Sequence, residues 1–354
     1  MGYKVLGLMS GTSLDGLDLA YVEFFEQKGQ WSFELHHATT LRYSDEWYSD
    51  LRNAQTLPKS ELQKLHRDYG AYLGTSCNKF IEQHQVHPEL IASHGHTVFH
   101  QPENRYTCQL GDGKVLAQTS GIQTVNDFRT LDVSLGGQGA PLVPVGDKLL
   151  FSKYDVCLNL GGFANVSFES DGSRIAFDVA PVNIVLNVLA NALGKEYDDN
   201  GELAATGSTD GQLLEKLDAL SYYLEPAPKS LSREWLDEQF MPVIGKTGIS
   251  NEDKLHTICE HIAVQVRRST VDLGINPGSK MLVTGGGALN GFLVDCIRRE
   301  TQLEVTVPDK SIIEYKEALI FALLGLLRIR GDINCLSSVT GAQRDCSCGV
   351  IVSP

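Results

Sequence analysis

The stretch Val5-Leu-Gly-Leu-Met-Ser-Gly-Thr-Ser-Leu-Asp-Gly-Leu-Asp-Leu-Ala20 lies near the start of the chain and decides how the rest is interpreted. Apolar residues lead into a small polar turn, and an alternating apolar run, Leu17 to Phe25, leads out of it. This pattern predicts two β-strands joined by a turn rich in Gly, Ser and Thr. Because glycine has no Cβ, backbone N–H groups in such a turn can approach an anion closely. The turn is therefore either a phosphate-binding loop or an ordinary polar hairpin.

The same turn carries side chains that suit a phosphate site. Ser10, Thr12 and Ser13 can donate hydroxyl hydrogens, and Asp15 or Asp18 could hold a hydrated Mg²⁺, with no other protein ligand to a metal expected. If phosphate binds here, we expect contacts from Gly11, Thr12, Ser13, Leu14, Asp15, Gly16, Leu17 and Asp18.

Length and composition indicate a soluble globular protein of about two domains. The chain has 354 residues, of which 42% are hydrophobic and 21% are charged. Its 44 acidic and 30 basic residues give a net charge of −14, which argues against a nucleic-acid binder. The N-terminus lacks the apolar region of a signal peptide, and the apolar run Ala318 to Leu327 is too short to span a bilayer. We therefore expect a cytoplasmic protein that binds neither nucleic acid nor membrane.

The cysteines and histidines do not predict a metal centre. The eight cysteines are scattered, which argues against a disulfide framework. Cys346-Ser-Cys348 together with Cys335 lacks C-x-x-C spacing, so a structural metal is not expected. His94 and His96 would share one face of a strand, but no nearby carboxylate or cysteine completes a ligand set. We expect these two histidines to line a pocket.

The opening pattern occurs a second time in the chain. Asp155–Leu160 predicts a strand, Gly161 and Gly162 lie in the turn after it, and Val166–Glu169 predicts a return strand. An internal repeat of this type is stronger evidence than either turn alone. Two such turns could clamp a polyphosphate from both sides.

A third glycine-rich turn follows later. Lys280–Thr284 predicts a strand, Gly285, Gly286 and Gly287 a turn, and the residues from Gly291 a helix. A strand–turn–helix connection of this kind brings backbone close to a bound group at a helix N-terminus. The alternative is a tight connection with no ligand.

The alternation of strands and helices predicts an α/β fold. A P-loop is excluded because no lysine lies beside Gly16, and a dinucleotide-binding motif is excluded because a strand, not a helix, follows that turn. The Gly- and Pro-rich segment 136–144 marks a loop between lobes. We therefore expect an N-terminal lobe at 1–134 with the first hairpin and a second lobe at 135–340 with the other two turns. We expect a C-terminal segment, 341–354, to pack back on the first lobe.

A series of short polar and glycine-rich motifs runs along the chain. They are Met9-Ser-Gly-Thr-Ser-Leu-Asp-Gly-Leu-Asp18, Ser93-His-Gly-His-Thr-Val98, Gln109-Leu-Gly-Asp112, Asp127-Phe-Arg129, Gly136-Gly-Gln-Gly-Ala-Pro-Leu-Val-Pro144, Asn159-Leu-Gly-Gly-Phe-Ala-Asn165, Thr284-Gly-Gly-Gly-Ala-Leu-Asn290, Glu317-Ala318 and Thr340-Gly-Ala342. Two lobes with related hairpin turns resemble the actin-like ATPase and sugar-kinase superfamily, and these motifs are similar to those of the anhydro-N-acetylmuramic acid kinases. The resemblance covers essentially the whole chain.

The resemblance implies a two-lobed actin-like (ribonuclease H-like) fold with ATP in a cleft between the lobes, held by the three glycine turns. It also implies an enzyme that uses ATP and Mg²⁺ and acts as a homodimer. Such enzymes open the 1,6-anhydro ring of anhydro-N-acetylmuramic acid with water and phosphorylate O6. The product is N-acetylmuramic acid 6-phosphate, an intermediate of peptidoglycan recycling.

The resemblance assigns the catalytic base to Asp178, which we expect at the end of the strand Arg174–Phe177. Water attacking an anomeric carbon needs a carboxylate opposite the leaving oxygen. An isolated aspartate at a helix start could instead serve as an N-cap. The family pattern Asp-Thr-Gly-Pro-Gly-Asn is changed here to Asp178-Val-Ala-Pro-Val-Asn183, which puts the local backbone path in question.

His96, Arg129 and Glu317 are weaker candidates for the sugar site. His96 stands where many relatives have glutamine, and both side chains can hydrogen-bond a sugar. Arg129 could pair with Asp127 or Asp132, or could bind the lactyl carboxylate of the substrate. Glu317 opens an apolar helix, where helix-dipole stabilisation alone would account for it.

Two other functions remain open on sequence grounds. The altered segment after Asp178 is compatible with a sugar-sensing relative that has lost turnover. The superfamily is also compatible with a kinase for an ordinary amino sugar.

Overall fold

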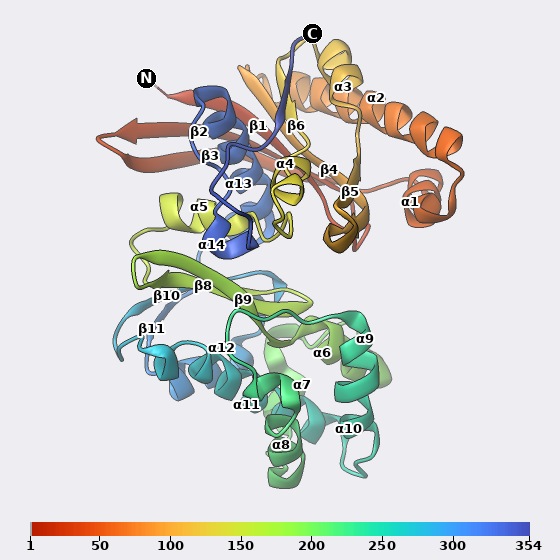
Figure 1. The fold of residues 1–354 in the computed structure, drawn as a ribbon. Coiled ribbons are helices and arrows are strands. Elements are labelled where there is room, and N and C mark those ends of the chain that lie inside the picture. Colours follow the sequence, from red (N-terminus) through yellow and green to blue (C-terminus); the bar gives the residue numbers. More distant parts are fainter. Residues whose placement is uncertain (1) are drawn as a thin grey trace. The chain divides into compact units, whose positions relative to one another are not determined.

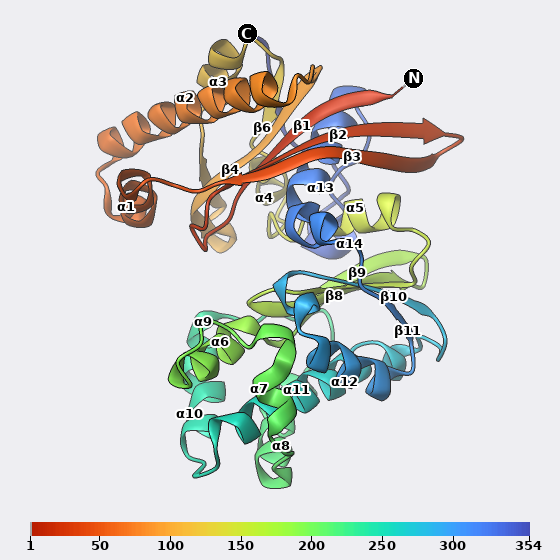
Figure 2. The same ribbon diagram turned by 180° about the vertical axis from the view of Figure 1, so that it is seen from behind.

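The computed structural model describes residues 2–354 and divides into two compact units. The first unit comprises Met1–Leu150 with Tyr315–Pro354, and the second comprises Phe151–Glu314. Each unit contains its own β-sheet with helices around it (Figure 1, and from behind in Figure 2). The predicted α/β class with two lobes is therefore confirmed.

In the described part of the chain, a seven-stranded mixed sheet forms the centre of the first unit. The strand order is β12-β6-β4-β1-β2-β3, and β5 pairs with β4. β2 is antiparallel to both β1 and β3, whereas β4 is parallel to β1 and β6 is parallel to β4. The strands are β1 (Tyr3–Ser10), β2 (Leu17–Gln27), β3 (Gln30–Leu41), β4 (Leu90–Gln101), β5 (Tyr106–Leu110), β6 (Thr124–Asn126) and β12 (Val350–Val352).

Two long helices cover opposite faces of this sheet, as the side chains of β1 show. Leu6 and Leu8 belong to the same buried cluster as Tyr69 and Leu73 of α2. Gly7 points the other way, where a Cβ would collide with the backbone of α13. The helices of this unit are α1 (Asp45–Asn53), η1 (Ala54–Thr56), α2 (Lys59–His84), η2 (Pro102–Asn104), α3 (Gly113–Ser120), α4 (Thr130–Ser134), α5 (Val143–Leu150), α13 (Lys310–Arg330, which begins in the second unit) and α14 (Ser337–Thr340).

The second unit has a five-stranded sheet among the described residues, in the order β11-β10-β7-β8-β9. Helix α11 packs on it through buried residues at helical spacing, such as Leu255, Ile258 and Ile262. Its strands are β7 (Val156–Leu160), β8 (Phe163–Ser170), β9 (Ser173–Pro181), β10 (Lys280–Thr284) and β11 (Glu304–Thr306). Its helices are α6 (Asn183–Ala192), η3 (Asp199–Gly201), α7 (Glu202–Thr206), α8 (Gly211–Asp218), η4 (Ser221–Leu224), α9 (Arg233–Trp235), the π-helical η5 (Leu236–Phe240), α10 (Met241–Gly245), α11 (Asn251–Arg268), η6 (Val271–Leu273), η7 (Gly286–Leu289) and α12 (Gly291–Thr301).

The two sheets share one topology. In each, three consecutive strands form an antiparallel meander, and two later strands add in parallel beside the first of them. The run β3-β2-β1-β4-β6 in one sheet corresponds to β9-β8-β7-β10-β11 in the other. The internal repeat predicted from the two glycine turns is thus present in both sheets.

The division into units differs from the predicted boundaries at 134/135 and 340/341, because residues 135–150 and 315–340 pack within the first unit. Asp132 accepts a hydrogen bond from the N–H of Gly139, and Lys316 of α13 pairs with Asp147 of α5 at 2.7 Å. Residues 341–354 also belong to the first unit, where β12 pairs with β6. The loop 136–144 therefore lies inside a unit rather than between two.

No helix in residues 2–354 has the length and apolar character needed to cross a membrane.

Candidate functional site

The first glycine turn joins β1 to β2, as the sequence predicts. The N–H of Leu14 closes the turn on the carbonyl of Gly11 at 3.3 Å, and Thr12, Ser13 and Asp15 are exposed. Gly16 packs so closely that a Cβ there would lie 2.6 Å from the carbonyl oxygen of Leu41. The polar side chains of the turn therefore face solvent, while its backbone at Gly16 is packed closely against Leu41.

The second hairpin turn and the GGG turn meet within the second unit. Gly285 has φ +80, and a Cβ on it would lie 2.8 Å from the carbonyl carbon of Leu160, the last residue of β7. Asn183 donates from Nδ2 to the Leu160 carbonyl at 3.2 Å, and its backbone N–H donates to Gly161 at 3.2 Å. The structure thus places Gly161, Gly162, Gly285, Gly286 and Gly287 at the carboxyl ends of β7 and β10. Open α/β sheets bind ligands at such an edge.

Asp178 lies in β9, opposite Asn165 of β8 and upstream of the strand end at Pro181. The expectation that it ends the strand is corrected, because β9 extends beyond Phe177 to pair with β8 as far as Phe163. The N-cap position of α6 is Val182, with no side-chain capping bond, so Asp178 does not cap that helix.

The carboxyl group of Asp178 is half-buried and held on one side only. Its Oδ2 accepts the N–H of Leu231 at 2.9 Å, and Oδ1 has no hydrogen-bond partner among the described residues. Burial raises the pKa of Asp178, and the Leu231 N–H opposes that shift. A carboxylate with a raised pKa and a free oxygen is suited to accept a proton.

The surroundings of Asp178 include residues that the sequence did not single out. The Tyr222 hydroxyl donates to the Asp178 carbonyl at 2.5 Å, and the Asp178 N–H donates to the Lys229 carbonyl at 3.0 Å. Both come from the segment around the Pro-broken loop 225–228, about 50 residues further along the chain. Because this segment is remote from Asp178 in sequence and carries no motif, the sequence did not predict these two contacts.

His96 lies beside the base of the first turn. It is paired with Ser10 in the parallel register of β1 and β4, and its Nδ1 is 3.0 Å from Ser10 Oγ. Ser10 also accepts a hydrogen bond from the Tyr43 hydroxyl at 2.7 Å. Burial lowers the pKa of His96 to about 4, so the ring is neutral near pH 7. The side chain therefore supports the end of β1, directly before Gly11.

Arg129 is held by His94 rather than by either predicted aspartate. Its Nε and Nη2 donate to His94 Nε2 at 3.1 and 2.8 Å, and its Nη1 donates to the Gly139 carbonyl at 2.6 Å. Asp127 instead accepts the N–H of Thr130 at 3.2 Å. The remaining guanidinium N–H groups have no partner among the described residues. Arg129 is thus oriented by protein contacts and still able to bind a carboxylate.

The pKa shifts of His94 and Arg129 are consistent with a neutral histidine that accepts hydrogen bonds from the guanidinium group. Burial and the nearby Arg129 hold the pKa of His94 well below its ordinary value, so His94 accepts through Nε2 and donates from Nδ1 to the Gly95 carbonyl at 2.9 Å. Burial lowers the pKa of Arg129 to about 10, and the negative charge of Glu317 opposes this shift. Glu317 is exposed on α13, and it is electrostatically coupled to Arg129 within the first unit.

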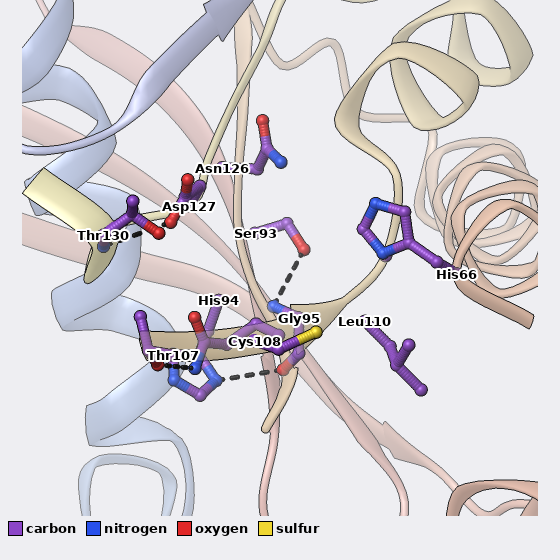
Figure 3. Close-up of a pocket in the computed structure, with 12 residues that line it drawn as sticks. His66, Ser93, His94, Gly95, Thr107, Cys108, Leu110, Asn126, Asp127 and Thr130 are labelled. Atoms are coloured by element: carbon purple, nitrogen blue, oxygen red, sulfur yellow. Dashed lines mark hydrogen bonds between the residues drawn. The ribbon is translucent and has the colours of Figure 1, made fainter. Parts of the chain in front are cut away.

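A polar pocket of about 200 Å³ is lined by His94, the partner of Arg129 (Figure 3). Its lining residues come from four parts of the first unit: His66 from α2, His94 and Ser93 from β4, Cys108 from β5, and Asp127 from the segment after β6. The prediction that His94 lines a pocket is confirmed, whereas His96 is not among the lining residues.

Comparison with known proteins identifies the family. The profile of the anhydro-N-acetylmuramic acid kinase family matches residues 3–354. The anhydro-N-acetylmuramic acid kinases of Gloeobacter violaceus and Rhodospirillum rubrum are 36% and 35% identical to the chain. The first match covers 96% of each chain, and the second covers 96% of this chain and 91% of its relative.

The chain belongs to the anhydro-N-acetylmuramic acid kinase family. It is accordingly a kinase that acts in sugar metabolism. Among solved structures, the match to component A of the Acidaminococcus fermentans (R)-2-hydroxyglutaryl-CoA dehydratase is distant, with a TM-score of 0.48 and 14% identity over 91% of this chain and 97% of that one.

Within this kinase family, the altered segment after Asp178 coincides with an irregularity of the sheet: the register of β8 with β9 shifts between Asn165, opposite Asp178, and Ala164, opposite Ala180. Ala180 and Val182 replace the glycines of the family pattern, and both are fully buried in the core of the second unit. Val182 has φ −125, outside the region that favours glycine. The two larger residues therefore fill volume in the core of the second unit.

Proposed function

We propose that this kinase opens the 1,6-anhydro ring of anhydro-N-acetylmuramic acid and transfers the γ-phosphoryl group of ATP to the released O6. The product is N-acetylmuramic acid 6-phosphate, as expected for peptidoglycan recycling. The observation that carries the proposal is Asp178, which has one oxygen held by the Leu231 N–H and the other free. Membership of the family supports the same assignment.

In the proposed reaction Asp178 accepts a proton from water as the water oxygen bonds to the anomeric carbon. The bond from that carbon to O6 breaks on the opposite face, so the configuration inverts. O6 attacks the γ-phosphorus of ATP, and ADP leaves. The proton taken by Asp178 is later released to solvent. Transfer of the phosphoryl group to O6 could replace the general acid that ordinary glycoside hydrolysis needs.

We assign the phosphates of ATP to the three glycine turns. The first turn contributes Gly11 to Asp18, and the second unit contributes Gly161, Gly162, Gly285, Gly286 and Gly287. Their small residues leave backbone N–H groups accessible, which suits a group whose transfer requires mainly positioning and charge stabilisation.

The exposed carboxylate of Asp15 and that of Asp18, which accepts a hydrogen bond from Thr40 at 2.5 Å, are hard oxygen donors that fit Mg²⁺. The ion would neutralise charge on the phosphates.

Arg129 is our candidate for binding the lactyl carboxylate of the sugar. Its guanidinium is already oriented by His94 and Gly139 and retains donors that have no partner among the described residues. Glu317 and His96 are the weaker sugar-side candidates, since His96 is engaged by Ser10. We further propose that the enzyme works in the cytoplasm as a homodimer, which light scattering on the purified protein would test.

One substrate panel tests the reaction. The protein is incubated with ATP, Mg²⁺ and either 1,6-anhydro-N-acetylmuramic acid, N-acetylmuramic acid or N-acetylglucosamine. ADP is measured by a coupled assay and the sugar product by mass spectrometry. We expect the anhydro sugar to yield ADP and a product heavier by one water and one phosphoryl group. Phosphorylation of only the open sugars would show an ordinary amino-sugar kinase, and tight sugar binding without ADP would show an impaired relative.

A further inference from the structure

Three buried cysteines converge in the first unit. The sulfurs of Cys335, Cys346 and Cys348 all lie within 4.8 Å of one another, and those of Cys346 and Cys348 are 3.2 Å apart. Each of these residues is at most 2% exposed. All three are free thiols.

The local fold holds these three residues in place through the backbone. Cys335 and Cys346 face each other in an antiparallel bridge, with reciprocal N–H to carbonyl hydrogen bonds of 3.1 Å. The Asn334 side chain accepts from the Cys348 N–H at 2.6 Å and donates to the Cys348 carbonyl at 2.8 Å. The backbone hydrogen bonds therefore hold the three cysteines close together, whichever rotamers their side chains adopt.

A buried carboxylate lies beside one of the three cysteines. Asp132 is 0% exposed, and its Oδ1 lies 3.1 Å from Cys335 Sγ. Its other donors are the Thr340 hydroxyl and the Gly139 N–H, each at 2.7 Å. None of these donors is cationic, although a buried carboxylate is costly without a compensating positive charge.

Three sulfurs within 4.8 Å of one another and a carboxylate oxygen 3.1 Å from one of them are donors that zinc uses. Zinc binds thiolates at about 2.3 Å in a tetrahedron, which puts the sulfurs roughly 3.8 Å apart. The sulfur separations here, 3.2 Å for one pair and no more than 4.8 Å for the others, are compatible with that value. A disulfide would use two of the thiols and leave the third thiol and Asp132 unaccounted for, whereas a metal ion uses all four groups.

We infer that Cys335, Cys346, Cys348 and Asp132 form a structural Zn²⁺ site. Binding releases the three thiol protons to solvent, and three zinc–thiolate bonds and one zinc–carboxylate bond form without any change in oxidation state. The sequence did not predict this site, because the cysteines lack C-x-x-C spacing and Asp132 lies 203 residues from Cys335.

The site would also stiffen the loop that orients Arg129. Asp132 Oδ2 accepts the Gly139 N–H, and the Gly139 carbonyl accepts from Arg129 Nη1 at 2.6 Å. A metal ion on Asp132 therefore acts on Arg129 through two successive hydrogen bonds. Removal of the ion would leave the His94 contacts of Arg129 in place and would loosen only its contact with Gly139.

The test is the metal content of the full-length protein, purified under reducing conditions from medium supplemented with zinc. We expect about one zinc per chain by mass spectrometry of the metals, and Cys346→Ser and Asp132→Asn should each reduce it at least fivefold. Cys77→Ala removes a buried thiol of α2 outside the cluster and should leave the zinc content unchanged.

A second readout does not depend on the folding of variants. Wild-type protein stripped of metal and titrated with Co²⁺ should develop thiolate-to-cobalt charge-transfer absorption that saturates at one equivalent and disappears on adding Zn²⁺. Zinc below a tenth of an equivalent per chain together with no cobalt absorption would overturn the site. So would a disulfide between any two of the three cysteines in metal-free protein isolated without an oxidant.

Discussion

The Asp178 carboxyl group is the proposed general base, so its replacement tests the mechanism directly. Replacement by Asn keeps an oxygen that can accept the Leu231 N–H but removes the basic site. We predict that Asp178→Asn lowers kcat by about 10²–10⁴-fold, the usual contribution of a general base, while ATP affinity stays within twofold. Turnover followed by ADP release and nucleotide binding by calorimetry would check this. Asp171→Asn, in the exposed turn between β8 and β9, is the matched control. Full activity in Asp178→Asn would refute the assignment.

The raised pKa of Asp178 adds a prediction about stability. Burial disfavours the charged carboxylate, so its ionisation destabilises the folded state at pH values above the ordinary pKa. Asp178→Asn should therefore have a free energy of unfolding equal to or greater than that of the wild type at pH 7, measured by urea denaturation. A large loss of stability would instead indicate that the aspartate is mainly structural.

Arg129 is predicted to select sugars that carry the lactyl group. Lys keeps the positive charge but cannot donate to His94, Gly139 and a carboxylate together. We expect Arg129→Lys to lower kcat/KM for anhydro-N-acetylmuramic acid by roughly tenfold to a hundredfold, from the loss of a charged hydrogen bond. The effect on 1,6-anhydro-N-acetylglucosamine, which lacks the lactyl carboxylate, should be less than threefold. Equal losses on both sugars would argue against a carboxylate contact, and the exposed Arg52→Lys serves as the control.

At the scale of elements, the register of β1 with β4 places His96 beside Ser10 and makes their pairing sensitive to pH. The pKa of His96 is about 4 in the folded chain against an ordinary 6.5. The unfolded chain therefore binds more protons between these values, so stability is full above 6.5 and is lost as pH falls through this window. Going from pH 7 to pH 5, the wild type should lose about 2 kcal/mol more than His96→Gln.

Urea denaturation at the two pH values measures that difference. Gln can accept a hydrogen bond from Ser10 but does not titrate, so the comparison isolates His96 from other groups such as His94. The exposed His87→Gln should show the wild-type dependence on pH. Identical slopes for His96→Gln and the wild type would show that His96 does not contribute.

The GGG turn is an element whose packing requires glycine. A Cβ at Gly285 would lie 2.8 Å from the Leu160 carbonyl group, and the backbone there has φ +80. We predict that Gly285→Ala lowers the free energy of unfolding by about 1–3 kcal/mol and raises KM for ATP at least fivefold. Gly248→Ala, at a glycine with open space around it, should change neither quantity appreciably. Unaltered ATP kinetics in Gly285→Ala would remove this turn from the proposed nucleotide site.

The sequence predicted those elements that are marked by a pattern of neighbouring residues. The hairpin around Gly11 to Gly16 and its repeat at Gly161 have glycine turns between alternating runs, and both formed as predicted. The end of β9 was misjudged because Asp178 is a polar residue that stays in the strand, where the Leu231 N–H donates to one of its two oxygens. The boundary at 134/135 was misjudged because Asp132 and its partners retain the loop through contacts made about 200 residues away in sequence. Long-range polar contacts of this kind have no periodicity or composition to reveal them.

At the scale of the whole molecule, the proposed nucleotide contacts come from both compact units. The first turn belongs to residues 1–150, and the other two glycine turns belong to 151–314. The chain passes between the units at 150/151 and again within α13, at 314/315. One ATP that contacts all three turns would therefore link two units that are otherwise joined by few covalent connections.

We predict that binding of nucleotide and sugar together makes the molecule more compact, as in hinge closure around a ligand. Asp178→Asn suits this measurement, because it should bind ATP and the anhydro sugar without consuming them. Small-angle X-ray scattering should show a smaller radius of gyration with both ligands at saturation than without them, and Gly285→Ala should need more ATP to reach the same change. An unchanged radius of gyration, with binding of both ligands confirmed by calorimetry, would mean that the turns of the two units do not share one nucleotide.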